Sequence, residues 1–214
     1  GSELVAVDQT VPPGKKISSN RYLLDSLIKG CRARSEDRGI VEDDDKAIRE
    51  LLSEIIDGTS DIIISTGGTG PGKYDLLDSY FEKLGGTIIF RSIAMSPGRS
   101  ALFGTIGGKL YFGLPGPPSA VTILFRELVL PAVRKMQGCS KFQYEQSDAL
   151  ITHDILSEKS GFHAIIEGIL SSRGCNNYVR VAGNHEPPNC HILLSPSSSS
   201  PVNGETVTVH RIDC

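Results

Sequence analysis

Three consecutive isoleucines, at positions 62–64, constrain the fold of this 214-residue chain more than any other feature. A short apolar run without polar alternation is typical of a strand covered on both faces, as in a parallel sheet. Apolar residues recur at helical spacing over residues 23–28 and 48–56 before the run, and over 76–84 after it. Helix signals that alternate with strand signals predict βαβ units, and therefore an α/β domain with a mostly parallel sheet over residues 1–140.

Capping residues mark the expected ends of the first two helices. Residues 18–20, Ser-Ser-Asn, offer N-caps to the first helix, and Gly30 stands where a left-handed stop belongs. Residues 43–44, both Asp, precede the second helix, and Gly58 ends it. The other expected elements are strands over residues 87–90 and 109–112 and a last helix from Pro118, which Pro131 should kink or divide.

The sequence changes character after Gly138. From Ser147 onward it has short β-like runs, many polar residues and turn signals, and residues 206–210 alternate with a period of two. We therefore expect a small all-β domain over residues 147–214, in which residues 196–201 form an exposed loop or hairpin tip.

Composition excludes several classes of function. The formal net charge is −3 with a pI of about 6.0, without the clustered Lys and Arg that neutralise a nucleic-acid backbone. No apolar run approaches the roughly 18 residues that span a bilayer. The five cysteines are odd in number and include no C-x-x-C pair, which argues against a disulfide framework and a zinc ribbon. We expect no nucleic-acid or membrane partner, and a reducing cytoplasm is the simplest setting.

A Gly-rich segment, residues 67–72, directly follows the isoleucine run and has four glycines in six positions. Its backbone N–H groups, together with the next helix N-terminus, form the kind of anion site that suits phosphate, and Thr66 and Thr69 add hydroxyl donors. Asp75 either caps that helix or holds a divalent cation beside the phosphate. The G-K-[ST] ending of a P-loop and the G-x-G-x-x-G spacing are absent. The alternative is a plain tight turn.

Three other segments carry weaker sequence signals for a binding site. Residues 114–120 contain three prolines that make a stiff wall, and the N–H groups of Ser119 and Ala120 can face an anion. Arg99, on a Pro-Gly turn, is either a phosphate or carboxylate fork or an ordinary surface arginine. The acidic residues 42–45 are either helix caps or a functional group, which would be a cation site or a contact to a ribose or pterin.

Taken together, these motifs resemble the molybdopterin molybdotransferases of the MoeA type, which include the gephyrin E domain. The resemblance covers roughly residues 1–138, and the tail from about residue 147 is similar to the small C-terminal β-domain of that family. The segments that carry it are residues 1–5, Asn20, and residues 39–44, 64–68, 97–98 and 114–116, with residues 150–154 and 204–207 in the tail.

The resemblance implies a three-layer α/β/α fold, a cytoplasmic homodimer, and binding of molybdopterin or adenylylated molybdopterin with Mg²⁺ and molybdate. The implied reaction is molybdenum insertion coupled to cleavage of the adenylyl phosphate, with a molybdopterin adenylyltransferase and molybdoenzymes as partners. Asp43 and Asp75 would be the catalytic acidic groups and the metal ligands. The implied pterin and phosphate contacts are Thr66, Gly67, Gly68, Thr69, Gly70, Gly72, Pro115, Gly116, Pro118 and Ser119, to which Lys73 and Arg99 add positive charge.

The chain departs from the usual pattern of this family at several positions. Ser2 stands where the family usually has Asp, and Lys73 stands where it has an acidic residue. Residues 96–100 read Ser-Pro-Gly-Arg-Ser instead of Lys-Pro-Gly-Lys-Pro, and residues 114–118 have Pro in place of Asn. We therefore expect pterin binding with weak or absent molybdenum insertion.

Two other functions stay open. The Gly-Gly-Thr-Gly form of the loop also resembles the MogA type, which adenylylates molybdopterin, and a non-catalytic pterin-binding scaffold is the third hypothesis. The β-rich tail favours insertion over adenylyl transfer, because the adenylylating type is usually a single domain.

Overall fold

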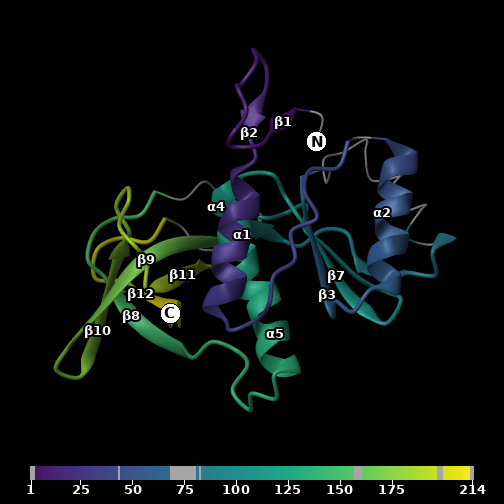
Figure 1. The fold of residues 1–214 in the computed structure, drawn as a ribbon. Coiled ribbons are helices and arrows are strands. Elements are labelled where there is room, and N and C mark those ends of the chain that lie inside the picture. Colours follow the sequence, from purple (N-terminus) through teal and green to yellow (C-terminus); the bar gives the residue numbers. More distant parts are fainter. Residues whose placement is uncertain are drawn as a thin grey trace. The chain divides into compact units, whose positions relative to one another are not determined.

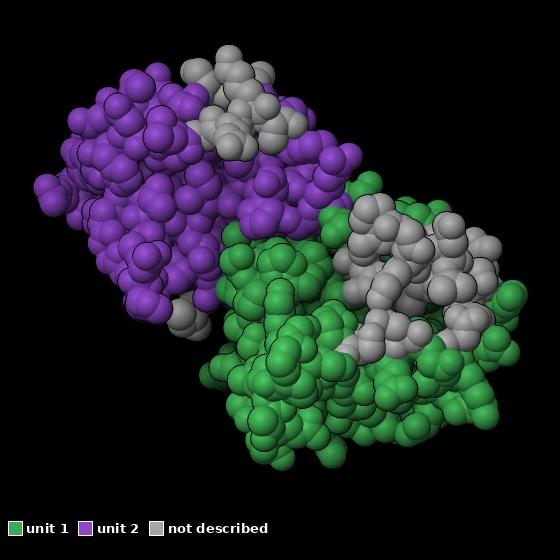
Figure 2. All heavy atoms as spheres, turned by 90° about the horizontal axis from the view of Figure 1, so that it is seen from above, with its two compact units in different colours: residues 1–93, 100–125 green, residues 94–99, 126–214 purple. Residues whose placement is uncertain are grey.

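The computed structural model describes residues 3–42, 44–67, 81, 83–156, 161–196 and 200–212. The chain divides into two compact units (Figure 2). Unit 1 comprises residues 1–93 and 100–125, and unit 2 comprises residues 94–99 and 126–214. No helix within the described ranges is both long and apolar enough to span a bilayer.

The isoleucine run forms the predicted strand in the sheet of unit 1. This sheet has the order β3 (Ile62–Thr66), β7 (Lys109–Leu114), β6 (Leu102–Ile106) and β4 (Thr87–Phe90). Figure 1 labels β3 and β7. Strand β3 pairs with β7 in parallel, which places Ile64 opposite Phe112. The strands expected over residues 87–90 and 109–112 are present.

The prediction of a mostly parallel sheet is wrong for the described strands. The pairs β6–β7 and β4–β6 are both antiparallel, so one of the three pairings is parallel. The cause is a hairpin between β6 and β7, whose two turn residues, Gly107 and Gly108, have φ of 55° and 76°. Positive φ at both positions is the requirement of a tight two-residue hairpin turn, and such a turn reverses the chain.

The ends of the first two helices differ in how well they were predicted. Helix α2 (Asp45–Asp57) is capped as expected, because the Asp44 carboxylate accepts the N–H groups of Lys46 and Ala47 at 3.1 and 3.0 Å, and the helix ends before Gly58. Helix α1 (Ser19–Gly30) has no side-chain cap from Ser18, and it includes Gly30. Arg32, with φ of 58°, takes the left-handed conformation that we expected at Gly30.

A buried lysine joins the end of α2 to the start of β7. Lys109 is 8% exposed, and its Nζ donates to the carbonyl oxygens of Gly58 at 2.8 Å and Ser60 at 2.6 Å. A cation that binds the last carbonyls of a helix also interacts favourably with the helix dipole. The core beside this anchor consists of Leu52, Ile55, Ile63, Phe81, Leu102, Ile106 and Tyr111.

Strands β1 (Leu4–Val5) and β2 (Lys16–Ile17) pair in parallel and form a two-stranded sheet of their own (Figure 1). Helix α4 (Pro118–Leu124) begins at the expected Pro118. It continues into a π-helical turn, η1 (Phe125–Val129), and then into α5 (Leu130–Met136). Pro131 was expected to kink or divide this helix, and the π-helical turn is the observed effect. The proline ring crowds the carbonyl four residues earlier, and the wider turn lies at that point.

Unit 2 contains the predicted small all-β domain, which closes into a barrel. The strands lie in the order β10–β8–β12–β11–β9, and β9 pairs again with β10, so the ring of five is complete. Strand β5 (Met95–Ser96) adds to β9 in parallel. The barrel strands are β8 (Gln146–Ile151), β9 (His163–Arg173), β10 (Asn176–Val181), β11 (Cys190–Leu194) and β12 (Thr206–Arg211).

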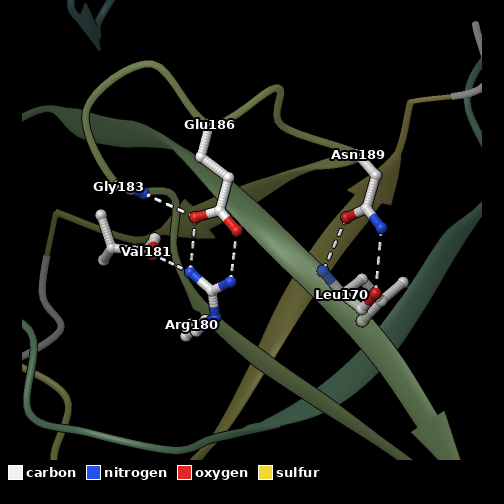
Figure 3. A network of polar contacts seen from close by, with 6 residues as sticks. All are labelled: Leu170, Arg180, Val181, Gly183, Glu186 and Asn189. Carbon is white, nitrogen blue, oxygen red and sulfur yellow. Dashed lines mark hydrogen bonds and ion pairs between the residues drawn. The ribbon is translucent and has the colours of Figure 1, made fainter.

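Side chains shape the connection between β10 and β11. Arg180 forms a two-pronged ion pair with Glu186, which also accepts the Gly183 N–H at 3.0 Å (Figure 3). The side-chain amide of Asn189 accepts the N–H of Leu170 at 2.6 Å and donates to its carbonyl oxygen at 3.0 Å. Asn189 therefore satisfies the backbone of β9 just before β11 begins.

A buried carboxylate attaches η1 to the barrel. Glu127 accepts hydrogen bonds from His191 Nδ1 and, at 2.9 Å, from His210 Nδ1, and these two histidines are opposite partners on β11 and β12. Burial alone would raise the pKa of Glu127, but the two histidine bonds outweigh it and lower the pKa from 4.5 to about 2. Gln146 contacts the other ring nitrogen of His210 at 2.9 Å.

We predict that Glu127→Gln lowers the free energy of unfolding at pH 7 by about 3 kcal/mol, the value that corresponds to the lowered pKa. A carboxyl whose pKa is lowered by folding stabilises the protein above its unfolded pKa. The difference between wild type and variant should therefore shrink as the pH falls from about 4.5 towards about 2. Urea unfolding followed by circular dichroism at pH 7, 4 and 3 measures this difference.

The matched control is Glu186→Gln. The pKa of Glu186 is also lowered to about 2, by its bonds from Arg180 and from the Gly183 N–H, but this carboxylate is exposed to solvent. Solvent screening makes an exposed pair much weaker than a buried one. Equal losses in the two variants would show that the burial of Glu127 contributes nothing.

Candidate functional site

The two loops proposed from the sequence start side by side at one edge of the unit 1 sheet. Thr66 and Leu114 are opposite partners at the carboxyl ends of β3 and β7, and the Gly67 N–H donates to the Leu114 carbonyl at 3.0 Å. Ligands of α/β sheets bind outside the carboxyl ends of the strands. The pairing thus places the start of the Gly-rich segment next to the Pro-rich segment at the edge where a ligand is expected.

A buried hydrogen bond fixes the end of β3 to the neighbouring strand β7. Ser65 Oγ lies 2.7 Å from the hydroxyl of Tyr111, which is 1% exposed. Burial raises the pKa of Tyr111, and the bond to Ser65 acts in the opposite direction. The Tyr111 ring also packs edge-on against Phe81, with 5.0 Å between centroids. The strand end that begins the Gly-rich segment is therefore held by the core.

Glycine serves a different purpose at Gly67 and at Gly116. Gly67 has φ of 76°, a backbone conformation that L side chains rarely adopt. Gly116 has no such φ, and a Cβ added at either glycine would meet no atom of the described residues within 4 Å. Backbone conformation thus explains glycine at 67, whereas neither conformation nor packing requires it at 116. Open space at 116 is what close approach of a ligand to the backbone needs.

The Pro-rich segment has a buried base and an exposed tip. Pro115 is buried, whereas Gly116, Pro117, Pro118 and Ser119 are exposed. Pro117 precedes helix α4 with extended backbone, and Pro118 and Ser119 form its first turn. The predicted contact residues at the tip are therefore open to solvent.

A third element, helix α1, reaches this site. The side-chain amide of Asn20 donates from Nδ2 to the carbonyl oxygen of Gly116 at 2.8 Å, across 96 positions in sequence. Sequence reasoning included Asn20 in the family resemblance but gave it no contact. The available signal was its position in the first turn of a helix, where a polar side chain can reach a neighbouring loop.

The structure leaves several proposed site residues untested. Asp43, Gly68, Thr69, Gly70, Gly72, Lys73 and Asp75 lie outside the described residues. Arg99 belongs to unit 2, is exposed, and places its guanidinium 4.7 Å from the ring centroid of Phe162. Within the described ranges, no three His, Cys, Asp or Glu side chains are grouped as metal ligands. For the acidic residues 42–45 the sequence left open a helix cap or a functional group. The structure decides this for Asp44 alone, which is a helix cap.

Solved structures share this arrangement of a mixed sheet and a small barrel. Two structures of the molybdopterin biosynthesis MoeA protein from Pyrococcus horikoshii match 99% of this chain with TM-scores of 0.77 and 0.68, each at 22% identity. This chain covers 52% and 51% of those chains. The fold is thus that of a MoeA-like protein.

Sequence comparison identifies the family. Residues 1–135 match the family described as "Probable molybdopterin binding domain", and the chain belongs to this family. Two relatives named molybdopterin molybdenumtransferase come from Nostoc sp., at 36% identity over 88% of this chain, and from Haemophilus influenzae, at 27% identity over 98%. The chain spans 44% and 54% of the length of these two relatives.

We predict that Gly67→Ala lowers the free energy of unfolding by about 1 kcal/mol, because alanine is strained at a positive φ. Gly116→Ala should change it by no more than about 0.5 kcal/mol, since the added methyl group meets no neighbour. Urea unfolding followed by circular dichroism compares the two. An equal loss in both variants would mean that the described backbone does not explain why glycine stands at 67.

Proposed function

We propose that this chain provides the pterin-binding domain and the C-terminal β-domain of a molybdopterin molybdenumtransferase. The observation that carries the proposal is the adjacency of two loops at the carboxyl ends of β3 and β7, joined by the hydrogen bond from Gly67 to Leu114. The family match over residues 1–135 suggests the ligand class, and the adjacency of the two loops supports a site for it at this edge.

The phosphate end of molybdopterin would bind the Gly-rich segment. Backbone N–H groups and the hydroxyls of Thr66 and Thr69 supply donors without a formal charge. Lys73 adds a positive charge to this segment, and Arg99 is proposed as a second phosphate contact. Pro115, Gly116, Pro118 and Ser119 would contact the same ligand from the neighbouring loop.

The substrates proposed for turnover are adenylylated molybdopterin and molybdate. We assign Asp43 and Asp75 to Mg²⁺, since the neighbouring Asp44 already accepts two backbone N–H groups as a helix cap. Bound Mg²⁺ would offset the negative charge that phosphate and molybdate bring together. Insertion is favoured over adenylyl transfer because the match to the Haemophilus influenzae relative extends over 98% of the chain, the barrel included.

The proposal also includes the oligomeric state, the cellular compartment and the protein partners. A homodimer in the cytoplasm, served by a molybdopterin adenylyltransferase and delivering its product to molybdoenzymes, is what the family resemblance implies. Residues 1–140 and 147–214 are the proposed domain limits.

The first test is Gly68→Val, which should abolish molybdopterin binding in isothermal titration calorimetry. A branched side chain at this position would occupy the space in which phosphate approaches the backbone. The matched control is Gly30→Val at the far end of α1, where an added Cβ meets nothing within 4 Å and φ is not positive. Unchanged affinity in Gly68→Val, with circular dichroism showing a folded protein, would place the ligand elsewhere.

The second test concerns turnover. We expect the unmodified chain to insert molybdenum weakly in a reconstitution assay with adenylylated molybdopterin, Mg²⁺ and molybdate. Ser2 and Lys73 stand where the resembling family usually has acidic groups, and a lysine ammonium repels Mg²⁺ and offers it no lone pair. The double variant Ser2→Asp with Lys73→Glu should raise the rate. Efficient insertion by the wild type would show that these two departures are without consequence.

A further inference from the structure

Asn20 carries an unsatisfied acceptor beside the proposed site. Its Nδ2 donates to the carbonyl oxygen of Gly116, and this contact identifies Oδ1 as the other end of the amide, because a carbonyl can bond only the NH₂ group. Oδ1 is buried and has no hydrogen-bond partner among the residues that the structure describes. A buried acceptor without a partner is costly, so it marks a place where a donor is missing.

The orphaned acceptor lies next to the part of the loop that a ligand can reach. Gly116, the residue that Asn20 holds, is exposed and borders open space on its Cβ side. A ligand that contacts the backbone at Gly116 would therefore approach the amide group of Asn20, which bonds the carbonyl oxygen of the same residue. The same side chain thus positions the loop and offers the loop's ligand an acceptor.

The chemistry of an amide oxygen decides which part of a ligand belongs there. A phosphate dianion presents acceptors only, so an unpaired acceptor repels it. A pterin ring carries an amide N–H and an amino group, and both are donors. We infer that Asn20 Oδ1 accepts a hydrogen bond from the ring of the bound pterin, so that the ring and not the phosphate lies next to α1. This inference rests on the proposed function.

The test compares two probes, inorganic phosphate and 6-hydroxymethylpterin phosphate, by isothermal titration calorimetry on the full chain. Asn20→Ala removes the acceptor and should weaken the pterin phosphate about tenfold while changing the affinity for inorganic phosphate by less than about twofold. Asn20→Asp keeps an acceptor oxygen but loses the donor that binds the Gly116 carbonyl. The added charge and the lost loop contact affect both probes alike, so the ratio of the two affinities should stay near the wild-type value.

Asn177→Leu is the matched control, because the side-chain amide of Asn177 also donates to a backbone carbonyl oxygen, that of Asp148, but belongs to unit 2. It should leave both affinities unchanged. A purely structural role for Asn20 would lower the two affinities together or lower only the melting temperature. An unchanged ratio in Asn20→Ala would overturn the inference.

Wild-type protein provides a measurement that needs no folded variant. The side-chain ¹⁵N–¹H signals of Asn20 should shift on addition of the pterin phosphate and stay in place with inorganic phosphate. Signals that move with neither probe, in a protein that binds the pterin phosphate, would overturn the inference and leave the proposed function intact. Failure of the wild type to bind the pterin phosphate at all would instead overturn the proposed function.

Discussion

The parallel pairing of β3 with β7 is the constraint on which the proposed site depends. It brings Thr66 and Leu114 to the same sheet edge, although 48 positions separate them. The bond from the Gly67 N–H to the Leu114 carbonyl extends the pairing one step beyond the strand. Lys109 fixes the start of β7 to the end of α2, and Tyr111 holds Ser65 from inside the core. Both loops therefore leave a rigid edge, which is what pre-organised ligand binding requires.

The isoleucine run and the Asp44 cap were predictable because their signals are local. The hairpin of β6 and β7 was not, because β6 has neither alternation nor a continuous apolar run and has a glycine at its centre. In the structure a Cβ at Gly104 would lie 2.6 Å from the Thr87 carbonyl oxygen and 3.0 Å from the Phe81 ring. Glycine is thus required by neighbours from two other segments. Without strand β6, the sheet looked mostly parallel.

The same distinction applies to the site: the features that depend on local sequence were predictable, and the contacts between distant residues were not. Glycines after a buried strand and prolines before a helix predicted where the two loops lie. The contact between Asn20 and Gly116 joins residues 96 positions apart. A polar residue in the first turn of a helix signals that it can reach a loop, but the signal does not say which loop. Glu127 illustrates the same limit, since its histidine partners are 64 and 83 positions away. Polar contacts of this range follow from the packed fold.

Among the described residues, each unit has a charged and largely buried side chain that holds a helix to its sheet, and the two side chains differ in their partners. Lys109 in unit 1 binds backbone carbonyl oxygens, which do not titrate. Glu127 in unit 2 binds two imidazoles, and its own lowered pKa links the barrel to pH. Acid therefore removes a stabilising contact from unit 2 but leaves the acceptors around Lys109 unchanged. The sheet edge proposed to bind the pterin is in unit 1, the unit whose buried charge, Lys109, has acceptors that do not titrate.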